Sequence, residues 1–247
     1  MITFIVPNYF AYKALNSIIR EFSRVDSECF SMLVVDAGGE EESFHKIETC
    51  NNIKIKVYYG LDSGIYNALN FGVEQVKTEY YLVLGVDDIF DFEKLDMISL
   101  ALTTLKSDIF FLSIKKNNVI VNSIRPDRIL SGPPGVFPSH TGGAIIRKSL
   151  HLDHGLYSES YQVLSDGLFV SKCLLDSRVR FALVGDVLCD VGAEGFSKRK
   201  ELLAEYESML IRNTLGQKKI ISLLIYLIRC TKRVVKMSFK YLGPRRR

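Results

Sequence analysis

An α/β fold with a mostly parallel sheet flanked by helices is predicted by three features of the sequence. Short apolar runs alternate with helical periodicities over residues 1–90, which is typical of strands joined by crossover helices. Gly, Pro, Asn and Asp bound these runs and mark short connections. The length of 247 residues suits one large domain with a full hydrophobic core.

Four buried strands are expected in the first part of the chain, each a short run rich in Ile, Val, Leu or Tyr. They span residues 2–6, 31–35, 53–59 and 80–86. Helices are expected between them, where apolar residues recur every three or four positions. These helices run to about residue 24, over 44–49 and to about residue 77.

The second part of the chain continues the alternation less regularly. We expect a helix over 93–107, a hairpin over 108–125, a strand over 143–147, a helix near 165–176 and a strand over 180–184. Residues 126–140 are rich in Pro and Gly and are expected to form an irregular loop. These elements define one domain over 1–215, followed by a helical tail over 216–247.

The positive charge of the chain is concentrated at its end. The formal net charge is +4, yet residues 218–247 hold ten of the 32 Lys and Arg and none of the 28 Asp and Glu. The rest of the chain is therefore acidic, which argues against a domain that binds nucleic acid. The basic tail instead indicates contact with an anionic surface.

Several features predict a cytoplasmic protein. The five cysteines are dispersed without a CxxC pair, which is typical of reduced thiols. The N-terminus has no basic leader and reads as a first strand. The longest apolar stretch, 220–228, is about half the length that spans a bilayer, so no transmembrane helix is expected. His45, His151 and His154 are expected at the surface and form no zinc pattern.

Polar residues follow all four strands of the predicted parallel sheet. They are Asn8 after the first strand, Asp36 after the second, Asp62 after the third, and Asp87 and Asp88 after the fourth. The carboxyl ends of parallel strands meet at one edge, where ligands bind in open α/β sheets. Carboxylates gathered there would repel a diphosphate unless a cation lay between them, and their oxygens suit Mg²⁺ or Mn²⁺. Such a cation would also stabilise the charge on a departing nucleotide diphosphate.

Four sequence blocks resemble those of family-2 inverting glycosyltransferases of the GT-A fold, especially the branch that builds bacterial surface polysaccharides. Residues 62–70, DSGIYNALN, are similar to that branch's D-x-G-I-Y-D-A-M-N block, and 84–88, LGVDD, to its L-N-x-D-D metal segment. The first strand, with IVPNY over 5–9, and the second, with VVDAGG over 34–39, are similar to the family's opening strands. The resemblance extends over about residues 1–200.

The resemblance implies a donor site and a metal site. Pro7, Tyr9 and Asp36 would hold the nucleoside, with the Asp36 carboxylate accepting from the uracil edge. Asp62 would lie near the base or ribose, and Tyr66 is a further candidate for donor binding. Asp87 would contact the ribose or the metal, and Asp88 would be the main ligand of Mn²⁺ or Mg²⁺.

The resemblance also implies the chemistry of transfer. Asp166, in LSDGL over 164–168, stands where the family places its general base. It would take the proton of the acceptor hydroxyl, so that in-line attack inverts the anomeric carbon. Residues 192–197, GAEGFS, resemble a late loop that closes over the diphosphate. The predicted function is transfer of a sugar, from a UDP-sugar by expectation, to a saccharide or lipid-linked saccharide.

Some positions depart from the family's pattern. They are Ser63 and Phe71 where relatives carry Lys, Asn67 where they carry Asp, and Gly85 where Asn is common. The absence of Q-x-x-R-W speaks against a processive polymer synthase. The departures leave open an alternative, a catalytically silent GT-A domain that binds nucleotide or saccharide in an assembly complex. A dehydrogenase is disfavoured because no G-x-G-x-x-G follows the first strand.

Most candidate residues also have purely structural interpretations. Asp36, Asp62 or Asp166 could cap the helix that follows it. Tyr66 could belong to the core. His140, which precedes the strand over 143–147, could face the acceptor or serve the fold alone.

The tail is expected to form a basic amphipathic helix. At about 100° per residue the basic and apolar side chains fall on opposite sides. The basic side holds Arg229, Lys232, Arg233, Lys236 and Lys240, and the apolar side holds Leu227, Cys230, Val234, Val235, Met237, Tyr241 and Leu242. Such a helix rests among lipid headgroups, so we expect residues 218–247 to bind the inner face of the cell membrane peripherally. The alternative is a helix that packs on the domain with its charged side in water.

Overall fold

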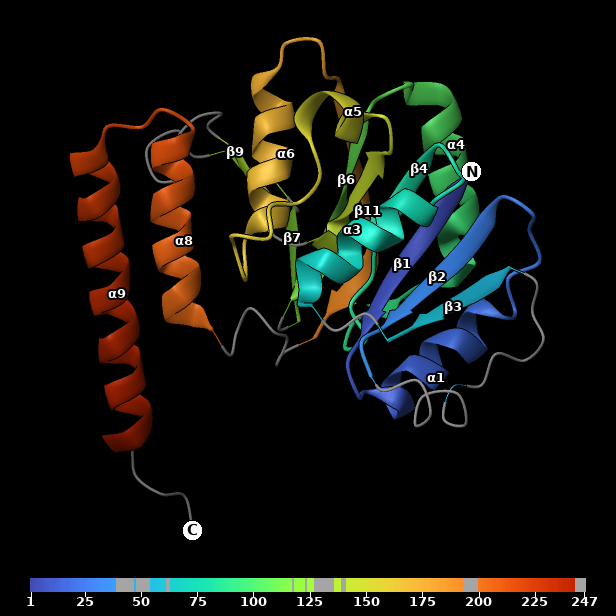
Figure 1. The fold of residues 1–247 in the computed structure, drawn as a ribbon, viewed down its shortest axis with the longest axis horizontal. Helices are drawn as coiled ribbons and strands as arrows, with labels where there is room; N and C mark the ends of the chain where they lie inside the picture. The colour runs from blue at the N-terminus through green and yellow to red at the C-terminus, as the bar shows by residue number, and fades with distance from the viewer. Residues whose placement is uncertain are drawn as a thin grey trace.

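The structure of the chain is a computed structural model that describes residues 1–38, 47, 54–60, 63–116, 118–122, 124–126, 136–138, 141–192 and 200–242. A central sheet carries helices on both faces (Figure 1). This three-layer arrangement confirms the predicted α/β fold with a Rossmann-like sheet.

The sheet is parallel in its first half and mixed in its second. Its strand order is β3-β2-β1-β4-β10-β6-β11-β5, and β7 pairs with β6. These strands are β1 (Ile2–Asn8), β2 (Phe30–Asp36), β3 (Ile55–Tyr59), β4 (Tyr80–Val83), β5 (Ile89–Phe90), β6 (Ile109–Lys116), β7 (Val119–Asn122), β10 (Ala144–Arg147) and β11 (Phe181–Val191). The four strands β1 to β4 pair in parallel, whereas β10 runs antiparallel to both β4 and β6. A separate small sheet pairs β8 (Ile124–Pro126) with β9 (Val136–Pro138).

Helices on the two faces bury two hydrophobic clusters against the sheet. One cluster contains residues of α1 (Tyr12–Phe22) and α4 (Leu95–Leu105), which follows the 3₁₀ turn η1 (Phe92–Lys94). The other contains residues of α3 (Ile65–Gln75), α5 (Leu150–His154) and α6 (Ser165–Leu175). A second 3₁₀ turn, η2 (Thr141–Gly143), precedes β10. Successive residues of β1 enter opposite clusters, as the alternation of side chains along a strand requires.

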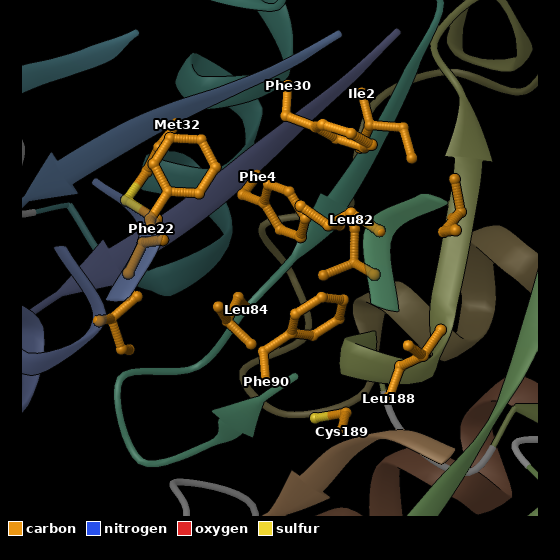
Figure 2. Packing of buried hydrophobic residues seen from close by; sticks show 14 of the residues in the cluster. Ile2, Phe4, Phe22, Phe30, Met32, Leu82, Leu84, Phe90, Leu188 and Cys189 are labelled. Atoms are coloured by element: carbon orange, nitrogen blue, oxygen red, sulfur yellow. The ribbon is translucent and has the colours of Figure 1, made fainter. Parts of the chain in front are cut away.

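Aromatic rings gather in the first cluster around Phe4 of β1, as Figure 2 shows. The Phe4 ring centroid lies 5.8 Å from that of Phe22, 5.2 Å from that of Phe90 and 5.5 Å from that of Phe92. Phe90 follows Asp88 by two residues, so this packing anchors one end of the turn that carries the candidate metal ligands.

Most of the predicted elements are confirmed within a few residues, and the differences lie mainly in the second half. The strand expected over 180–184 continues to Val191, because it pairs with β6 along its whole length. Two short strands, β8 and β9, fall at the ends of the segment expected to be an irregular loop. Helices α5 and α8 (Glu201–Thr214) were not predicted. The helix expected over 44–49 lies outside the described residues.

The chain ends in two long helices, α8 and α9 (Lys219–Leu242), which stand side by side at one end of the molecule (Figure 1). Ser222 and Ile225 of α9 and Ile211 of α8 are buried. A helix in the tail was predicted, and α9 confirms it. No helix of the part of the chain that the structure describes is both long and apolar enough to cross a bilayer.

The orientation of α9 differs from the expected one, because two of its basic residues contact α8. Arg233 Nη2 lies 2.6 Å from Glu205 Oε1, and Arg233 Nη1 lies 2.6 Å from Glu201 Oε2. Arg229 Nη1 lies 3.5 Å from Glu205 Oε2. The expectation that these two arginines face a membrane is therefore wrong, because the unpredicted helix α8 supplies carboxylates for them. The side chains of Lys236 and Lys240 lie outside the described residues.

The other side of α9 is aliphatic and exposed. Its members are Ile220, Leu223, Leu224, Leu227, Ile228, Val234 and Val235, and we call them the aliphatic face of α9. At about 100° per residue they fall on the side opposite Ser222, Arg229 and Arg233, which face α8. The aliphatic face of α9 therefore points away from α8.

Candidate active site

The carboxyl ends of β1 and β2 join the first two candidate residues. Asn8 pairs in register with Asp36, and Asn8 Nδ2 donates a hydrogen bond of 2.6 Å to Asp36 Oδ1. Asn8 Oδ1 accepts from the backbone N–H of Ala11 at the start of α1. Asp36 is fully buried, and its Oδ2 has no hydrogen-bond partner among the described residues. An acceptor in this position can take a further N–H donor.

Exposed aromatic rings lie next to this edge. Tyr9 is 63% exposed and Phe10 is 50% exposed, and their ring centroids are 4.7 Å apart. Phe10 has a φ of 55°, a left-handed conformation that costs energy for a bulky residue and is often found at functional sites. Pro7 lies in β1 opposite Val35, one position before the Asn8–Asp36 pair.

Asp87 and Asp88 lie in the turn between β4 and β5. Asp88 is buried, and each of its carboxylate oxygens accepts a backbone N–H. Oδ2 accepts from Gly85 at 3.1 Å, and Oδ1 accepts from Gly192, which follows β11, also at 3.1 Å. Asp87 beside it is exposed. The turn therefore presents one open carboxylate next to one that the backbone holds in place.

Two glycines allow this close approach. A Cβ at Gly192 would lie 2.4 Å from Asp87 Oδ2 and 2.6 Å from the Asp87 carbonyl oxygen. A Cβ at Gly85 would lie 2.9 Å from Asp88 Oδ2. Any larger residue at either position would push the carboxylates away. Gly85, where relatives commonly carry Asn, therefore fits the close packing of Asp87 and Asp88 around this position.

Asp166 lies in the first turn of α6 and contacts Tyr66 in the first turn of α3. Tyr66 Oη donates a hydrogen bond of 2.8 Å to Asp166 Oδ1. Burial, and then the negative charge of Asp166, raise the pKa of Tyr66, so that its hydroxyl stays protonated as a donor. The N-cap residue of α6 is Leu164, so the interpretation of Asp166 as an N-cap is wrong. Tyr66 is buried, yet its hydroxyl reaches a candidate catalytic group.

The segment before α6 is held from two sides. Asn70 of α3 bonds both backbone groups of Tyr157, donating to its carbonyl and accepting from its N–H at 2.9 Å each. Glu207 of α8 accepts three backbone N–H groups, from Gln162 at 2.6 Å, Val163 at 2.9 Å and Leu164 at 2.9 Å. Sequence reasoning missed Glu207, which lies in an unpredicted helix. Asn70 ends the DSGIYNALN block and could have been singled out there.

A buried chain of hydroxyl groups lies beneath α6. Tyr157 Oη is 2.7 Å from Tyr81 Oη, which is 2.7 Å from His151 Nε2. His151 Nδ1 lies 2.9 Å from the carbonyl oxygen of Gly155, so this nitrogen carries the proton. Burial lowers the pKa of His151 to about 4. The expectation that His151 lies at the surface is wrong, because its ring stacks on Phe169 with centroids 4.1 Å apart.

The structure brings most of the described candidates to one edge of the sheet. Tyr9, Asp36 and the Asp87–Asp88 pair follow β1, β2 and β4, which run in parallel. Tyr66 begins the helix that follows β3, and Asp166 is hydrogen-bonded to it. Asp62, His140 and residues 193–197 lie outside the described residues. Within the described ranges, no three His, Cys, Asp or Glu side chains gather into a complete metal site.

Comparison with known proteins identifies the family. The signature described as glycosyl transferase family 2 matches residues 3–165. Among solved structures, residues 1–349 of S. aureus TarS in complex with UDP-GlcNAc match with a TM-score of 0.66 and 18% identity, over 99% of this chain and 76% of that one. A mannosyltransferase of Pyrobaculum calidifontis, PcManGT, in complex with GDP-Man and Mn2+ matches with a TM-score of 0.63 and 13% identity, over 98% of this chain and 76% of that one.

A comparison with curated proteins gives no significant match. The identities to the solved structures are low, so these likenesses establish the fold, whereas the signature over 3–165 establishes the family. The chain belongs to glycosyl transferase family 2 and is a glycosyltransferase with the GT-A fold.

Proposed function

We propose that the protein is an inverting, metal-dependent transferase that moves a sugar from a UDP-sugar to a hydroxyl of a saccharide or lipid-linked saccharide in bacterial surface-polysaccharide synthesis. The observation that carries the proposal is the Asp87–Asp88 turn, at the same edge of the sheet as Asp36. TarS bound to UDP-GlcNAc and PcManGT bound to GDP-Man support a nucleotide-sugar donor, because their folds match this chain.

In this proposal the nucleoside lies along the ends of β1 and β2. Oδ2 of Asp36 would accept the N–H of the uracil edge, which suits a buried oxygen without a partner among the described residues. Because this carboxylate is fully covered by protein atoms, the residues that cover it must move aside when the base enters. Pro7 and the exposed ring of Tyr9 would contact the nucleoside, and Asp62 the base or ribose.

The Asp87–Asp88 turn suits a divalent cation, Mn²⁺ or Mg²⁺. A hard cation prefers carboxylate oxygens, and two carboxylates here are adjacent. Backbone N–H groups of Gly85 and Gly192 hold the Asp88 carboxylate in place, and the Asp87 carboxylate beside it is open to solvent. The donor's phosphates would complete the coordination. When bound, such a cation stabilises the negative charge on the leaving diphosphate.

Asp166 would act as the general base. Its carboxylate takes the proton of the acceptor hydroxyl as the acceptor oxygen bonds to the anomeric carbon. The bond from that carbon to the diphosphate oxygen breaks, and the diphosphate leaves with the electron pair. A single displacement of this kind inverts the anomeric configuration. The role of Tyr66 is then to hold the carboxylate through its 2.8 Å hydrogen bond, in addition to its predicted contact with the donor.

The test of this chemistry is transfer by Asp166→Asn, with Asp96→Asn, an exposed residue of α4, as a matched control. We expect Asp166→Asn to bind UDP normally and to lose transfer by ~10²- to 10⁴-fold, because the amide cannot accept the proton. The control should retain wild-type rates. Undiminished transfer by Asp166→Asn would refute the assignment. UDP binding by the wild type without turnover on a broad acceptor panel would favour a silent domain.

We further propose that the aliphatic face of α9, and not its arginine side, enters an anionic bilayer. Half-exposed side chains such as Leu224, Leu227 and Ile228 gain about 25 cal/mol for each Å² of apolar surface removed from water. The exposed side chains of Lys219 and Lys232 flank this face and suit anionic headgroups. This placement would hold the domain close to a lipid-linked acceptor at the inner face of the membrane.

A further inference from the structure

One buried carboxylate of α8 is bound, among the described residues, by main-chain N–H groups. Glu207 is 4% exposed, and its two oxygens accept the consecutive N–H groups of residues 162–164. A buried charge needs such partners, and hydrogen bonds to an ionised acceptor are stronger than neutral ones. Three of these bonds to successive amides fix the path of the backbone at that point. We call this contact the Glu207 clamp.

The clamp acts at the start of the helix that carries the candidate base. Leu164, whose N–H lies 2.9 Å from Glu207 Oε2, is the N-cap residue of α6, and Asp166 follows two positions later. The Leu168 N–H then bonds the Leu164 carbonyl as the first turn closes. The position of Glu207 is therefore transmitted to Asp166 through a short and hydrogen-bonded stretch of chain.

Asp166 is thereby placed by two neighbouring elements. From α3, Tyr66 Oη donates to the Asp166 carboxylate. From α8, Glu207 sets where α6 begins. If the clamp loosened, the first turn of α6 could shift and the 2.8 Å contact to Tyr66 would lengthen. Misplacement of a reacting group by about 1 Å can cost ~100-fold in rate.

We infer that Glu207 is a positioning residue for sugar transfer, which aligns Asp166 through the backbone of residues 162–164. The inference rests on the proposed role of Asp166 as the general base. It assigns to α8, outside the matched family segment 3–165, a part in the reaction.

The helix provides its own matched control. Glu201 also lies on α8, but its carboxylate pairs with Arg233 of α9 and not with the segment before α6. Glu207→Gln and Glu201→Gln therefore make the same chemical change on the same helix. In Glu207→Gln the amide NH₂ must face at least one backbone N–H, so two donors oppose each other and the clamp loosens.

The experiment measures kcat and the donor KM for wild type, Glu207→Gln, Glu201→Gln and Tyr66→Phe, with UDP binding and melting temperature as folding controls. We expect Glu207→Gln to lower kcat by ~10- to 100-fold, with a donor KM close to that of the wild type. Glu201→Gln should leave both constants unchanged. Glu207→Asp, which keeps the charge, should recover part of the rate and serves if Glu207→Gln fails to fold.

Two further readouts separate positioning from a loss of stability. Loss of the Tyr66 hydrogen bond raises the pKa of the Asp166 carboxylate, so the acid limb of the pH–kcat profile should move to higher pH in Glu207→Gln and in Tyr66→Phe alike. Because both changes act on one contact, the double variant should be little slower than the slower single variant. Additive losses with an unmoved acid limb would overturn the inference.

The inference and the proposed function fail in different ways. Wild-type transfer that survives Asp166→Asn would remove the proposed base. A dead Asp166→Asn next to a Glu207→Gln variant with wild-type kcat would overturn the clamp alone.

Discussion

At the scale of single residues, backbone N–H groups hold the main candidate metal ligand, Asp88, in place. Asp88 is fixed by the N–H groups of Gly85 and Gly192, which come from turns more than a hundred residues apart in sequence. Asp36 is held differently, by the side-chain amide of Asn8. Because the Asp88 carboxylate is held in place by the backbone, binding of a cation there would need little movement of its side chain.

Gly192 leaves no room for a Cβ beside Asp87. In Gly192→Ala the new methyl group would meet both the side chain and the carbonyl oxygen of Asp87, so the turn itself must move. We expect Mn²⁺-dependent binding of UDP to weaken by ~10-fold, or about 1.4 kcal/mol, in calorimetry. Gly185→Ala is the control, since a Cβ there has no atom within 4 Å. Equal affinities of the two variants for UDP would show that the close contact between Gly192 and Asp87 does not affect binding.

Candidates that follow strands could be predicted from the local sequence, whereas Asp166 was reached only through the family resemblance. Asp36, Asp87 and Asp88 follow buried strands, and the parallel pairing places them as expected at one edge. Glu207 gave no signal, because its partners are main-chain amides, which any sequence offers. His151 was misplaced because a lone histidine next to Leu150 and Leu152 gives no indication of which side is buried.

At the scale of elements, the packing of helix α5 against helix α6 supports the helix that carries Asp166. Helix α5 packs through His151 on Phe169 of α6, and burial of the ring favours its neutral form. This packing lies under the helix that carries Asp166. Protonation of His151 would place an uncompensated charge in that interface.

The pH dependence of stability follows from this contact. Burial lowers the pKa of folded His151 from its ordinary value of 6.5 to about 4, so the unfolded chain binds more protons between these two values. Its contribution is therefore complete above pH 6.5 and is lost as the pH falls towards 4, by at most about 3 kcal/mol. We expect urea unfolding of the wild type to lose more stability between pH 7 and pH 4.5 than that of His151→Asn. Parallel losses in both proteins would contradict the buried, neutral state.

Element boundaries show what periodicity alone can and cannot supply. The strands β1, β2 and β4 and the helices α1, α3 and α6 were predicted because their apolar residues repeat at the expected spacing. The antiparallel insertion of β10 between β4 and β6 depends on pairing partners far away in sequence, which a local pattern does not encode. Helix α8 was missed because it buries charged residues, namely Glu205, Glu207 and Arg212, where periodicity expects apolar ones.

At the scale of the whole molecule, the two C-terminal helices add an exposed apolar surface that is separate in sequence from the candidate active site. Glu205 of α8 forms ion pairs with Arg229 and Arg233 of α9, and the aliphatic face of α9 points away from α8. A helix at the end of the chain was correctly predicted, but the carboxylates that pair with its arginines could not be predicted without α8. The exposed side of α9 is therefore more apolar than expected, because Arg229 and Arg233 face α8.

Membrane binding can be tested on this face. In a variant with Leu224→Ser, Leu227→Ser and Ile228→Ser, we expect partitioning onto vesicles with anionic lipid to fall by ~10²-fold, because about 1 kcal/mol of burial is lost at each half-exposed position. Leu100→Ser, which removes a 65% exposed leucine from α4, should bind vesicles like the wild type. Flotation of both variants with vesicles measures the difference. Full retention of the triple variant on the vesicles would exclude this face as the membrane contact.

The central claim is that the acidic edge of the sheet recruits a cation and, through it, the diphosphate of the donor. Calorimetric titration of UDP into wild type and Asp88→Asn, each with and without Mn²⁺, tests it most directly. We expect tight binding to wild type only with Mn²⁺, and a loss of that enhancement in Asp88→Asn, since one of two carboxylate ligands is gone. Binding of UDP that is equally tight without the metal, or an Mn²⁺ enhancement that persists in Asp88→Asn, would contradict the claim.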